Sequence, residues 1–462
     1  MTKCMLISFF SLLLAAFSSC RKSAFLNTQS DQSLLVPQTL EDCQNLLNNE
    51  IVMNGIGNSG YPSLGQAGCD DFYVIQKWYN GYTTQEQQAV IWAQDVYKGG
   101  EVNDWDLPYR TVLYANEVLT TLAGLHPTDD QQMDWNTAKG GALFFRAFSF
   151  YSLGQIFAPV YDSSKATREA GICLRLQANM TEKLSRATVQ QTYDQIIADL
   201  QTAIPLLPLA PLSHTTQPYR AAAYGLLARV YLSAGDYRDA GVYADSCLQL
   251  QSTLMDYNTI SLPPDLSSPF TRSNSEVIFD AVLFATGASV TVRSFTDSLL
   301  YRSYQGGDLR KDLFFIPGSN FFIGRYDEDE YAFCGLATDE MYLTRAECYA
   351  RAGNTVDAMK DLNTLLRARW VSGSFTPYTA TDAWDALQQI LQERRKELLY
   401  RGLRWTDLRR LNKDPRTALE LNRTVEGLGS FVLAPNSSLY VYAIPDYVIQ
   451  DNPGMEQNIR QE

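Results

Sequence analysis

The densest group of charged side chains in this sequence lies between Glu393 and Arg410. Two carboxylates in such a group could serve as the acid and the base of glycoside hydrolysis. Glu393 and Glu397, however, are four residues apart with three basic residues between them, a spacing that balances charge along one helix. We therefore interpret the motif as a structural network of ion pairs, in which Trp405 and Leu408 form a buried face.

The other reactive side chains do not form a catalytic or metal-binding pattern. The chain has two histidines, His126 and His214, and it lacks a nucleophile elbow, an HExxH helix and a phosphate-binding loop. Asp70-Asp71 could bind a cation, but such a pair is usually just solvated. The six cysteines after Cys20 do not have the spacing of a zinc site, and their pairing as disulfides stays open. We expect no catalytic residue, no metal site and no cofactor.

Aromatic side chains suggest a different chemistry, which is the binding of a sugar. A sugar presents apolar C–H faces and a rim of hydroxyls, so flat rings supply contact area and polar side chains supply hydrogen bonds. One aromatic group lies in a glycine-containing stretch without helical periodicity. Its candidate ligand-binding residues are Tyr73, Trp78, Tyr79, Asn80 and Tyr82. For each of them, packing against the helices beneath is an equally open alternative.

A second and weaker candidate group contains Tyr301 and Tyr304, with Arg302 between them, close to Gly306-Gly307. Trp92 and Trp105 flank apolar or helical segments instead. We expect these two tryptophans to be structural.

Composition limits the partners of the chain. Its 462 residues carry 38 basic and 51 acidic side chains, for a formal net charge of -13. This balance argues against nucleic acid, because binding phosphates requires clustered Lys and Arg. A hydrophobic content of 45% is ample for a large core and excludes wholesale disorder.

Two segments repeat each other and indicate how these side chains are positioned. Aromatic residues and alanines at i, i+4 and i+7 face one side of a helix, and a glycine followed by Asp or Asn supplies a turn. This pattern resembles the tetratricopeptide repeat, a helix–turn–helix unit. The matching positions, at an offset of 118 residues, include Tyr224 and Tyr342, Tyr231 and Tyr349, and the turns Ala234-Gly235-Asp236 and Ala352-Gly353-Asn354.

Further helical stretches extend the pattern over Tyr109–Leu122, Ala142–Ile156 and Thr188–Ala203. We predict a mainly α fold in which tetratricopeptide-like helix pairs, at about 105–250 and 338–411, form one scaffold. Long irregular insertions on the ligand side are expected at about 50–104 and 251–337. The first is predicted to form exposed loops, and the second to contain a little β structure.

The N-terminus has the form of a bacterial lipoprotein signal. Lys3 precedes an apolar run from Met5 to Phe17, which is followed by Ser18-Ser19-Cys20. The run is shorter than the roughly 20 residues that a membrane-spanning helix needs. We therefore predict a signal peptide at 1–19, lipidation of Cys20 and a single domain at 20–462. An ordinary signal peptide that happens to contain a cysteine is the alternative.

Several motifs, taken together and in order, resemble the SusD/RagB family of outer-membrane nutrient-binding lipoproteins of Bacteroidetes. No single motif is decisive, but the set spans the whole chain. The motifs are Phe25-Leu26-Asn27, 35–42, 145–148 with 154–157, 393–398 with Gly402, Arg404-Trp405 and 407–410, and Ile444-Pro445, 451–453 and Gln457-Asn458.

The resemblance implies a tetratricopeptide-based, mostly helical protein that binds an oligosaccharide, a polysaccharide or a peptide. It also implies a partner, a SusC-like TonB-dependent transporter barrel over which the lipoprotein sits as a lid. The protein would then be attached to the outer membrane by its N-terminal lipid and face the cell surface. Many surface lipoproteins of this group carry acidic residues after the acylated cysteine, whereas this chain has Arg21-Lys22-Ser23. Membrane anchoring is therefore better supported than surface display.

The leading hypothesis is a non-catalytic lipoprotein that captures a glycan and passes it to the transporter. Within the family, the alternative is capture of a peptide. From other classes, the alternatives are a tetratricopeptide scaffold lipoprotein without a nutrient ligand and, last, a glycoside hydrolase. The aromatic groups favour a glycan over a scaffold role, and a hydrolase would require two carboxylates at a cleft.

Overall fold

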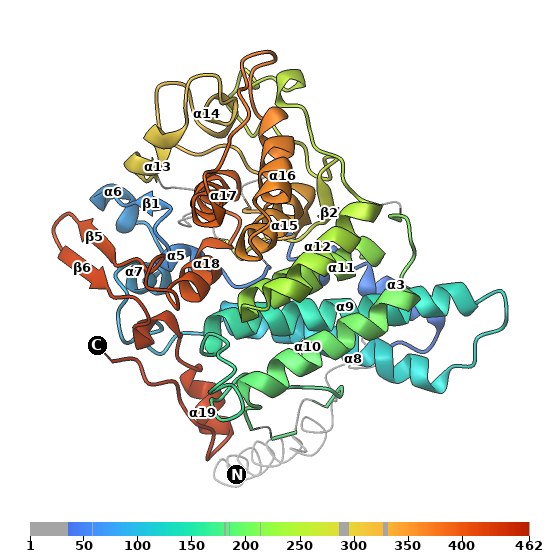
Figure 1. Ribbon diagram of the computed structural model, residues 1–462. Helices are drawn as coiled ribbons and strands as arrows, with labels where there is room; N and C mark the ends of the chain where they lie inside the picture. The colour runs from blue at the N-terminus through green and yellow to red at the C-terminus, as the bar shows by residue number, and fades with distance from the viewer. Residues whose placement is uncertain are drawn as a thin grey trace, which may run out of the picture.

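The structure is a computed structural model that describes residues 36–461, except for 58, 180–181, 184, 213, 286–294 and 327–330. The predicted signal peptide and Cys20 lie outside the described residues. Long helices form one side of the molecule, and short helices and strands from the insertions and the C-terminal part of the chain form the other side (Figure 1).

The long helices make a scaffold in which consecutive helices pack side by side. α15 also contacts α12 and α17, so the array continues across the insertion between residues 250 and 338. This arrangement confirms the predicted mainly α fold with tetratricopeptide-like helix pairs. Within the described ranges, none of the helices is both long and apolar enough to span a bilayer. The scaffold helices are α8 (Asn103–Gly124), α9 (Gln132–Phe157), α10 (Val189–Leu206), α11 (Arg220–Ala234), α12 (Tyr237–Leu250), α15 (Thr338–Arg351), α16 (Thr355–Arg367) and α17 (Ala383–Glu397).

The two repeated segments form the pairs α11–α12 and α15–α16, and their turns share one conformation. Gly235 and Gly353 have φ angles of 82° and 80°, a left-handed backbone that glycine adopts without strain. Asp236 and Asn354 then cap the second helix, because each side chain accepts a hydrogen bond from the backbone N–H three residues later. The repeat read from the sequence is therefore a repeat of structure, including its turn.

The central helix α9 joins its neighbours through one buried cation. The Arg146 guanidinium lies 2.7 Å from the Asp199 carboxylate of α10 and donates a 2.9 Å hydrogen bond to Asn116 of α8. On the opposite side of α9, the ring of Phe148 packs edge-on against Phe279 of β2 (Val277–Phe279), with centroids 5.4 Å apart. α9 is thus buried on nearly all sides.

Short elements from the insertions and from the N- and C-terminal segments complete the fold. The described strands form three two-stranded antiparallel sheets, β1–β3, β2–β4 and β5–β6. The short helices are α3 (Leu40–Leu47), α4 (Glu50–Met53), α5 (Leu64–Gly68), α6 (Gln76–Tyr79), α7 (Thr84–Val90), α13 (Ser298–Ser303), α14 (Arg310–Phe314), α18 (Arg404–Leu411), α19 (Asp446–Asp451), and the 3-10 turns η2 (Tyr257–Thr259) and η3 (Ser438–Tyr440). The strands are β1 (Phe72–Tyr73), β2 (Val277–Phe279), β3 (Phe295–Thr296), β4 (Leu336–Ala337), β5 (Leu421–Val425) and β6 (Gly429–Leu433).

The prediction that the first insertion forms exposed loops is wrong for much of its length. All five residues of α5 are buried, and this helix packs against α18. A side-chain carbon added at Gly68 would lie 2.8 Å from the Trp405 ring, so the glycine allows two elements to approach closely. Trp92 and Trp105 are buried and structural, as expected, and the Trp92 ring N–H donates to the Gly68 carbonyl at 2.8 Å.

The six cysteines of the described ranges are buried free thiols. Burial raises the pKa of the Cys43 thiol to about 11, and the neighbouring Asp42 adds to this rise. These thiols are therefore protonated at neutral pH and unreactive. The question of disulfide pairing, which the sequence leaves open, is answered for these six residues.

Candidate functional site

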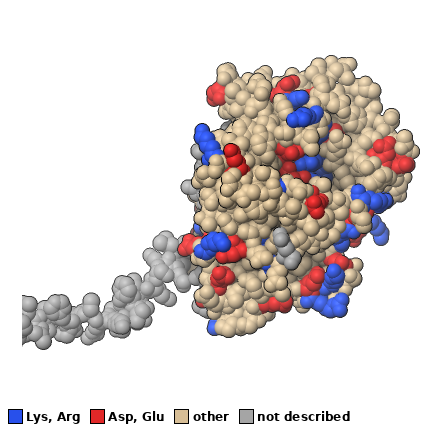
Figure 2. Space-filling model, turned by 90° about the vertical axis from the view of Figure 1, so that its left-hand side faces the viewer, with Lys and Arg blue, Asp and Glu red and all other residues tan. Residues whose placement is uncertain are grey.

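Both candidate aromatic groups lie on the side of the molecule where β1, α6 and α13 meet (Figure 1). β1 pairs with β3, which runs through Asp297 directly into α13. The Asp297 N–H donates a 2.8 Å hydrogen bond to the Asp71 carbonyl and ties the two insertions together. Figure 2 shows this side of the molecule, and most of its surface is uncharged. We call this side of the molecule, formed by β1, β3, α6 and α13, the insertion face.

Tyr73 is the most exposed ring of the first group, with 38% of its surface accessible. Its partner across the two-stranded sheet is Phe295, and the two rings are stacked, with centroids 5.7 Å apart and planes at 14°. Phe321 pairs with Phe295 from the other side and packs edge-on at 5.7 Å. Sequence reasoning missed Phe295 and Phe321, because only strand pairing brings them beside Tyr73. We call these three residues the aromatic strip.

The remaining members of the first group divide between surface and interior. Asn80 is exposed and Trp78 is half-buried, with the Lys77 ammonium 5.7 Å from its ring. Tyr79 and Tyr82 are 6% and 5% exposed, so they support the face from beneath. The Tyr79 hydroxyl donates to the Gln87 carbonyl of α7, which fixes α6 on its neighbour. The alternative of packing on the helices beneath thus fits Tyr79 and Tyr82.

The second group divides in the same way. Tyr301 is half-buried on α13, with the Lys311 ammonium 5.1 Å from its ring. Tyr304 is 1% exposed, and its hydroxyl donates to the Lys396 carbonyl at 2.8 Å. The expectation that Tyr304 contacts a ligand is therefore corrected, because its ring belongs to the interior.

A groove of about 460 Å³ lies between α13 and the helices α17 and α18. The wall formed by α17 carries the exposed Gln388 and Gln392 and the half-buried Trp384. The Arg416 guanidinium lies 4.5 Å from the centre of the Trp384 ring, a cation–π contact that holds the ring at the rim. Sequence reasoning missed this groove, because its walls come from segments more than 80 residues apart. Amides, an arginine and a flat ring are the side chains that contact sugars.

Asp70 and Asp71 are neither solvated nor placed to bind a cation. The Asp70 carboxylate lies 2.6 Å from Arg404 and 3.0 Å from Arg395. Burial raises the pKa of Asp70, but these two guanidinium groups outweigh that effect and lower it below the usual range. Asp71 is 1% exposed, and burial together with Asp70 raises its pKa. The solvated interpretation of this pair is wrong.

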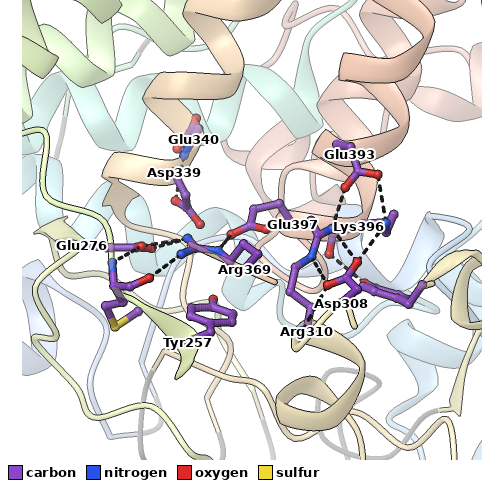
Figure 3. A network of polar contacts seen from close by, with 12 residues as sticks. Tyr257, Glu276, Asp308, Arg310, Asp339, Glu340, Arg369, Glu393, Lys396 and Glu397 are labelled. Atoms are coloured by element: carbon purple, nitrogen blue, oxygen red, sulfur yellow. Dashed lines mark hydrogen bonds and ion pairs between the residues drawn. The ribbon is translucent and has the colours of Figure 1, made fainter. Parts of the chain in front are cut away.

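The charged motif is a buried network, as predicted (Figure 3). Arg310 and Arg369, both fully buried, lie on either side of Glu397, with guanidinium–carboxylate distances of 2.9 and 2.7 Å. Glu393 binds Arg310 at 2.6 Å and the Lys396 ammonium at 2.9 Å. Every carboxylate oxygen of Glu393 and Glu397 therefore already faces a cation.

The network also connects insertions to scaffold. Arg369, directly after α16, binds Glu276 at 2.8 Å, and Asp308 lies 2.7 Å from Arg310 and 3.1 Å from Lys396. Burial raises the pKa of Glu276, although Arg369 opposes this rise. A carboxylate that is fully paired and inaccessible cannot protonate a glycosidic oxygen, so these residues do not form a hydrolase site.

The described residues contain no group of three or more His, Cys, Asp or Glu side chains that could hold a metal ion. The fold and the face together define a class of protein: a helical-repeat scaffold that presents aromatic rings from its insertions and a polar groove between α13 and the helices α17 and α18. Its acidic clusters serve the structure.

Comparison with known proteins identifies the family. A family model described as "Starch-binding associating with outer membrane" matches residues 24–232, and the SusD family model matches residues 338–460. The two matches follow each other along the chain and cover most of it. The chain belongs to the SusD/RagB family, which confirms the resemblance found in the sequence.

Relatives and solved structures agree with this assignment. SusD-like protein P2 of Formosa agariphila is 25% identical over 376 residues, which cover 66% of this chain and 71% of that protein. A SusD-like carbohydrate binding protein from Bacteroides vulgatus has a TM-score of 0.69 at 21% identity, covering 92% of this chain and 99% of that one. Surface glycan-binding protein A from Bacteroides fluxus has a TM-score of 0.67 at 17% identity, covering 91% and 99%. These structures share the fold of this chain.

Proposed function

We propose that this protein is a non-catalytic binding protein that captures an oligosaccharide or polysaccharide on the insertion face. The observation that carries this proposal is the exposed stack of Tyr73 on Phe295. The two ring planes lie within 14° of parallel, so Phe295 supports the exposed Tyr73 ring, whose flat apolar surface suits the C–H face of a pyranose ring. Two neighbours of the same fold, from Bacteroides vulgatus and Bacteroides fluxus, are described as binding carbohydrate or glycan, which supports the same class of ligand here.

We further propose that the ligand extends from the aromatic strip across α13 to the groove at Trp384. Leu299 of α13 is 74% exposed and lines the groove, while β3, the strand of Phe295, leads directly into this helix. Trp78, Asn80 and Tyr301 flank the path, and Gln388 supplies a hydrogen-bonding amide at its end. The proposed ligand is therefore a chain of several sugar units.

Affinity electrophoresis of the mature protein against a panel of polysaccharides tests the proposal. We expect one polysaccharide to retard the protein, and we expect Tyr73→Ala, Trp78→Ala and Trp384→Ala each to weaken retardation about tenfold, the effect of losing about 1.4 kcal/mol of contact energy. Trp135→Ala is the matched control, because this ring contacts Lys139 on α9 in the scaffold. Equal retardation of all variants would contradict the site, and binding of peptides with no polysaccharide retarded would contradict the ligand.

We also propose that a lipid on Cys20 anchors the protein to the outer membrane, where it passes the glycan to a SusC-like TonB-dependent transporter. The family description places such proteins at the outer membrane, and Ser18-Ser19-Cys20 has the form of a lipidation signal. Cys20→Ala should move the protein from the membrane fraction to the soluble fraction and reduce uptake of the bound glycan, while affinity in vitro stays unchanged. An unaltered membrane fraction would exclude this anchor.

A further inference from the structure

The charged side chains of the groove at Trp384 are all basic. Arg395 of α17, Arg404 of α18 and Arg416 line it, and none of its lining residues in the described part of the chain is acidic. The chain as a whole carries a formal net charge of -13, so the groove is a local exception. A concave surface lined by one sign of charge attracts ligands of the opposite sign.

Two of these arginines share one carboxylate. The Arg404 guanidinium lies 2.6 Å from the Asp70 carboxylate, and the Arg395 guanidinium lies 3.0 Å from it. The adjacent Asp71 is buried, accepts a 3.2 Å hydrogen bond from the Gln66 amide and does not line the groove. At the groove surface, one carboxylate therefore compensates two guanidinium groups.

Each of these two guanidinium groups keeps one free donor. Arg404 binds Asp70 through Nε and Nη2, whereas Arg395 binds it through Nη2 alone. Within the described residues, Nη1 of either arginine has no hydrogen-bond partner, and this atom is not buried. The side chains of Arg404 and Arg395 are 13% and 24% exposed, so water screens their charges only in part. Their Nη1 groups are thus available to a ligand in the groove.

Arg416 adds a third guanidinium at the rim. Its pair with Asp414 uses Nε and Nη2, and its side chain is 64% exposed. The acidic residues next to Trp384 do not offset this charge inside the groove. Asp382 and Asp385 accept hydrogen bonds from backbone N–H groups at the start of α17, and neither lines the groove.

Free guanidinium N–H groups indicate the chemistry of the ligand. Hydrogen bonds between arginine and an oxyanion are roughly twice as strong as neutral ones, and the planar guanidinium matches the shape of such a group. We propose that the groove binds the acidic unit of an anionic glycan, whose carboxylate or sulfate ester accepts hydrogen bonds from Arg395 and Arg404. This inference rests on the proposed function and specifies its substrate class. The uncharged aromatic strip contacts the C–H face of one unit, and the groove selects the charge of another.

Affinity electrophoresis with polysaccharides of known charge tests the ligand class. The uronate polymers are polygalacturonate and alginate, the sulfated polymers are carrageenan and dextran sulfate, and the neutral polymers are starch and dextran. We expect at least one anionic polymer to retard the protein more than either neutral polymer does, and to retard it less as salt is added. Retardation by a uronate polymer identifies a carboxylate ligand, and retardation by a sulfated polymer identifies a sulfate ester.

The outcomes separate this inference from the proposed function. Retardation by neutral polymers alone would overturn the preference for an anionic glycan and leave glycan capture intact. Retardation by none of the six polymers would contradict the proposed function and this inference with it.

Gln392→Glu tests whether the acidic unit binds in the groove. Gln392 is exposed there, one helical turn before Arg395, so glutamate adds a negative charge with almost no change of shape. Repulsion between like charges should weaken retardation by the anionic polymer about tenfold. The matched control is Gln201→Glu, the same change at an exposed position of α10 outside the groove. Equal retardation of the two variants would overturn the assignment to this groove.

Arg395→Lys tests the guanidinium itself. Lysine keeps the positive charge and can still bind Asp70, but it lacks the planar fork that offers a second donor to the ligand. Affinity for the anionic polymer should fall about tenfold, the effect of losing one hydrogen bond to a charged acceptor. Unfolding temperatures of all variants check the fold, and the exposed Gln392→Glu and Gln201→Glu should match wild type. Binding of the anionic polymer as in wild type by both Arg395→Lys and Gln392→Glu would contradict the proposed site.

Discussion

Replacing Glu397 by glutamine is expected to lower the free energy of unfolding by about 3–5 kcal/mol. Glu397 is 1% exposed and lies between Arg310 and Arg369, which are themselves fully buried. Glutamine removes the negative charge and places an NH₂ group against a guanidinium, so two buried cations lose part of their compensation. Because a protein of this kind is stable by only about 5–15 kcal/mol, the loss is a large fraction of the total.

Urea unfolding followed by circular dichroism measures this effect. The matched control is Lys98→Gln, which removes an ion pair with Asp95 whose side chains are 51% and 61% exposed. Water already screens that pair, so its loss should cost less than about 1 kcal/mol. Similar losses in the two variants would show that the network of Figure 3 contributes no more than surface charge.

The network illustrates what the sequence could reveal. The spacing of Glu393 and Glu397 indicated a structural network of ion pairs, which is confirmed, but within the helix only Glu393 and Lys396 pair with each other. Their main partners, however, are Arg310 and Arg369, which lie outside the motif. Helical spacing reports neighbours three and four residues away, whereas these contacts span 28 to 87 residues and depend on the packing of the insertions.

The scaffold was predictable for a physical reason. Helix pairs with the same turn need the same residues, so Gly235 and Gly353 and the caps after them recur at one offset. The insertions follow no such rule. Their glycines suggested exposed loops, but at Gly68 the missing side chain makes room for Trp405. A glycine needed for close packing and one needed for a loop look alike in a sequence.

In the candidate site, too, the sequence does not distinguish a residue at the surface from one in the interior. Tyr73 lies at the surface, whereas Tyr79 and Tyr304 are buried, and nothing in their local sequence distinguishes them. Phe295 becomes part of the site only through the pairing of β3 with β1, two strands more than 200 residues apart. The sequence therefore pointed to the region of the proposed site, but tertiary contacts decide which rings lie at the surface.

Acidification should destabilise the protein through Glu347. This carboxylate is fully buried, 2.6 Å from the Arg410 guanidinium and 2.8 Å from Arg351. Burial raises its pKa, but Arg410 and Arg351 outweigh that effect and lower it from 4.5 to about 2. Between these two pH values the unfolded chain binds a proton that the folded chain does not. The contribution of the Glu347 carboxylate to the free energy of unfolding is therefore fully present above pH 4.5 and is lost as the pH falls towards 2.

The change in the free energy of unfolding follows from the difference between the pKa values of Glu347 in the folded and unfolded chains. A difference of about 2.5 pKa units corresponds to about 3 kcal/mol at pH 7. Glu347→Gln should be less stable than wild type by at least this amount at neutral pH, since it also breaks the pair with Arg410. Lowering the pH to 3 should reduce the difference between the two proteins by about 2 kcal/mol.

Comparing the two proteins isolates Glu347 from the distant carboxylates, which titrate equally in both, although the neighbouring Asp407 also feels the charge of Glu347. Urea midpoints measured at intervals from pH 7 to pH 3 should therefore approach each other as the pH falls. Asp95, whose side chain is 61% exposed, forms a surface pair with Lys98, and Asp95→Asn should show a much smaller change over this range. If the difference between wild type and Glu347→Gln stayed constant with pH, Glu347 would have the same pKa in the folded and unfolded chains, and its ion pairs would not contribute to acid stability.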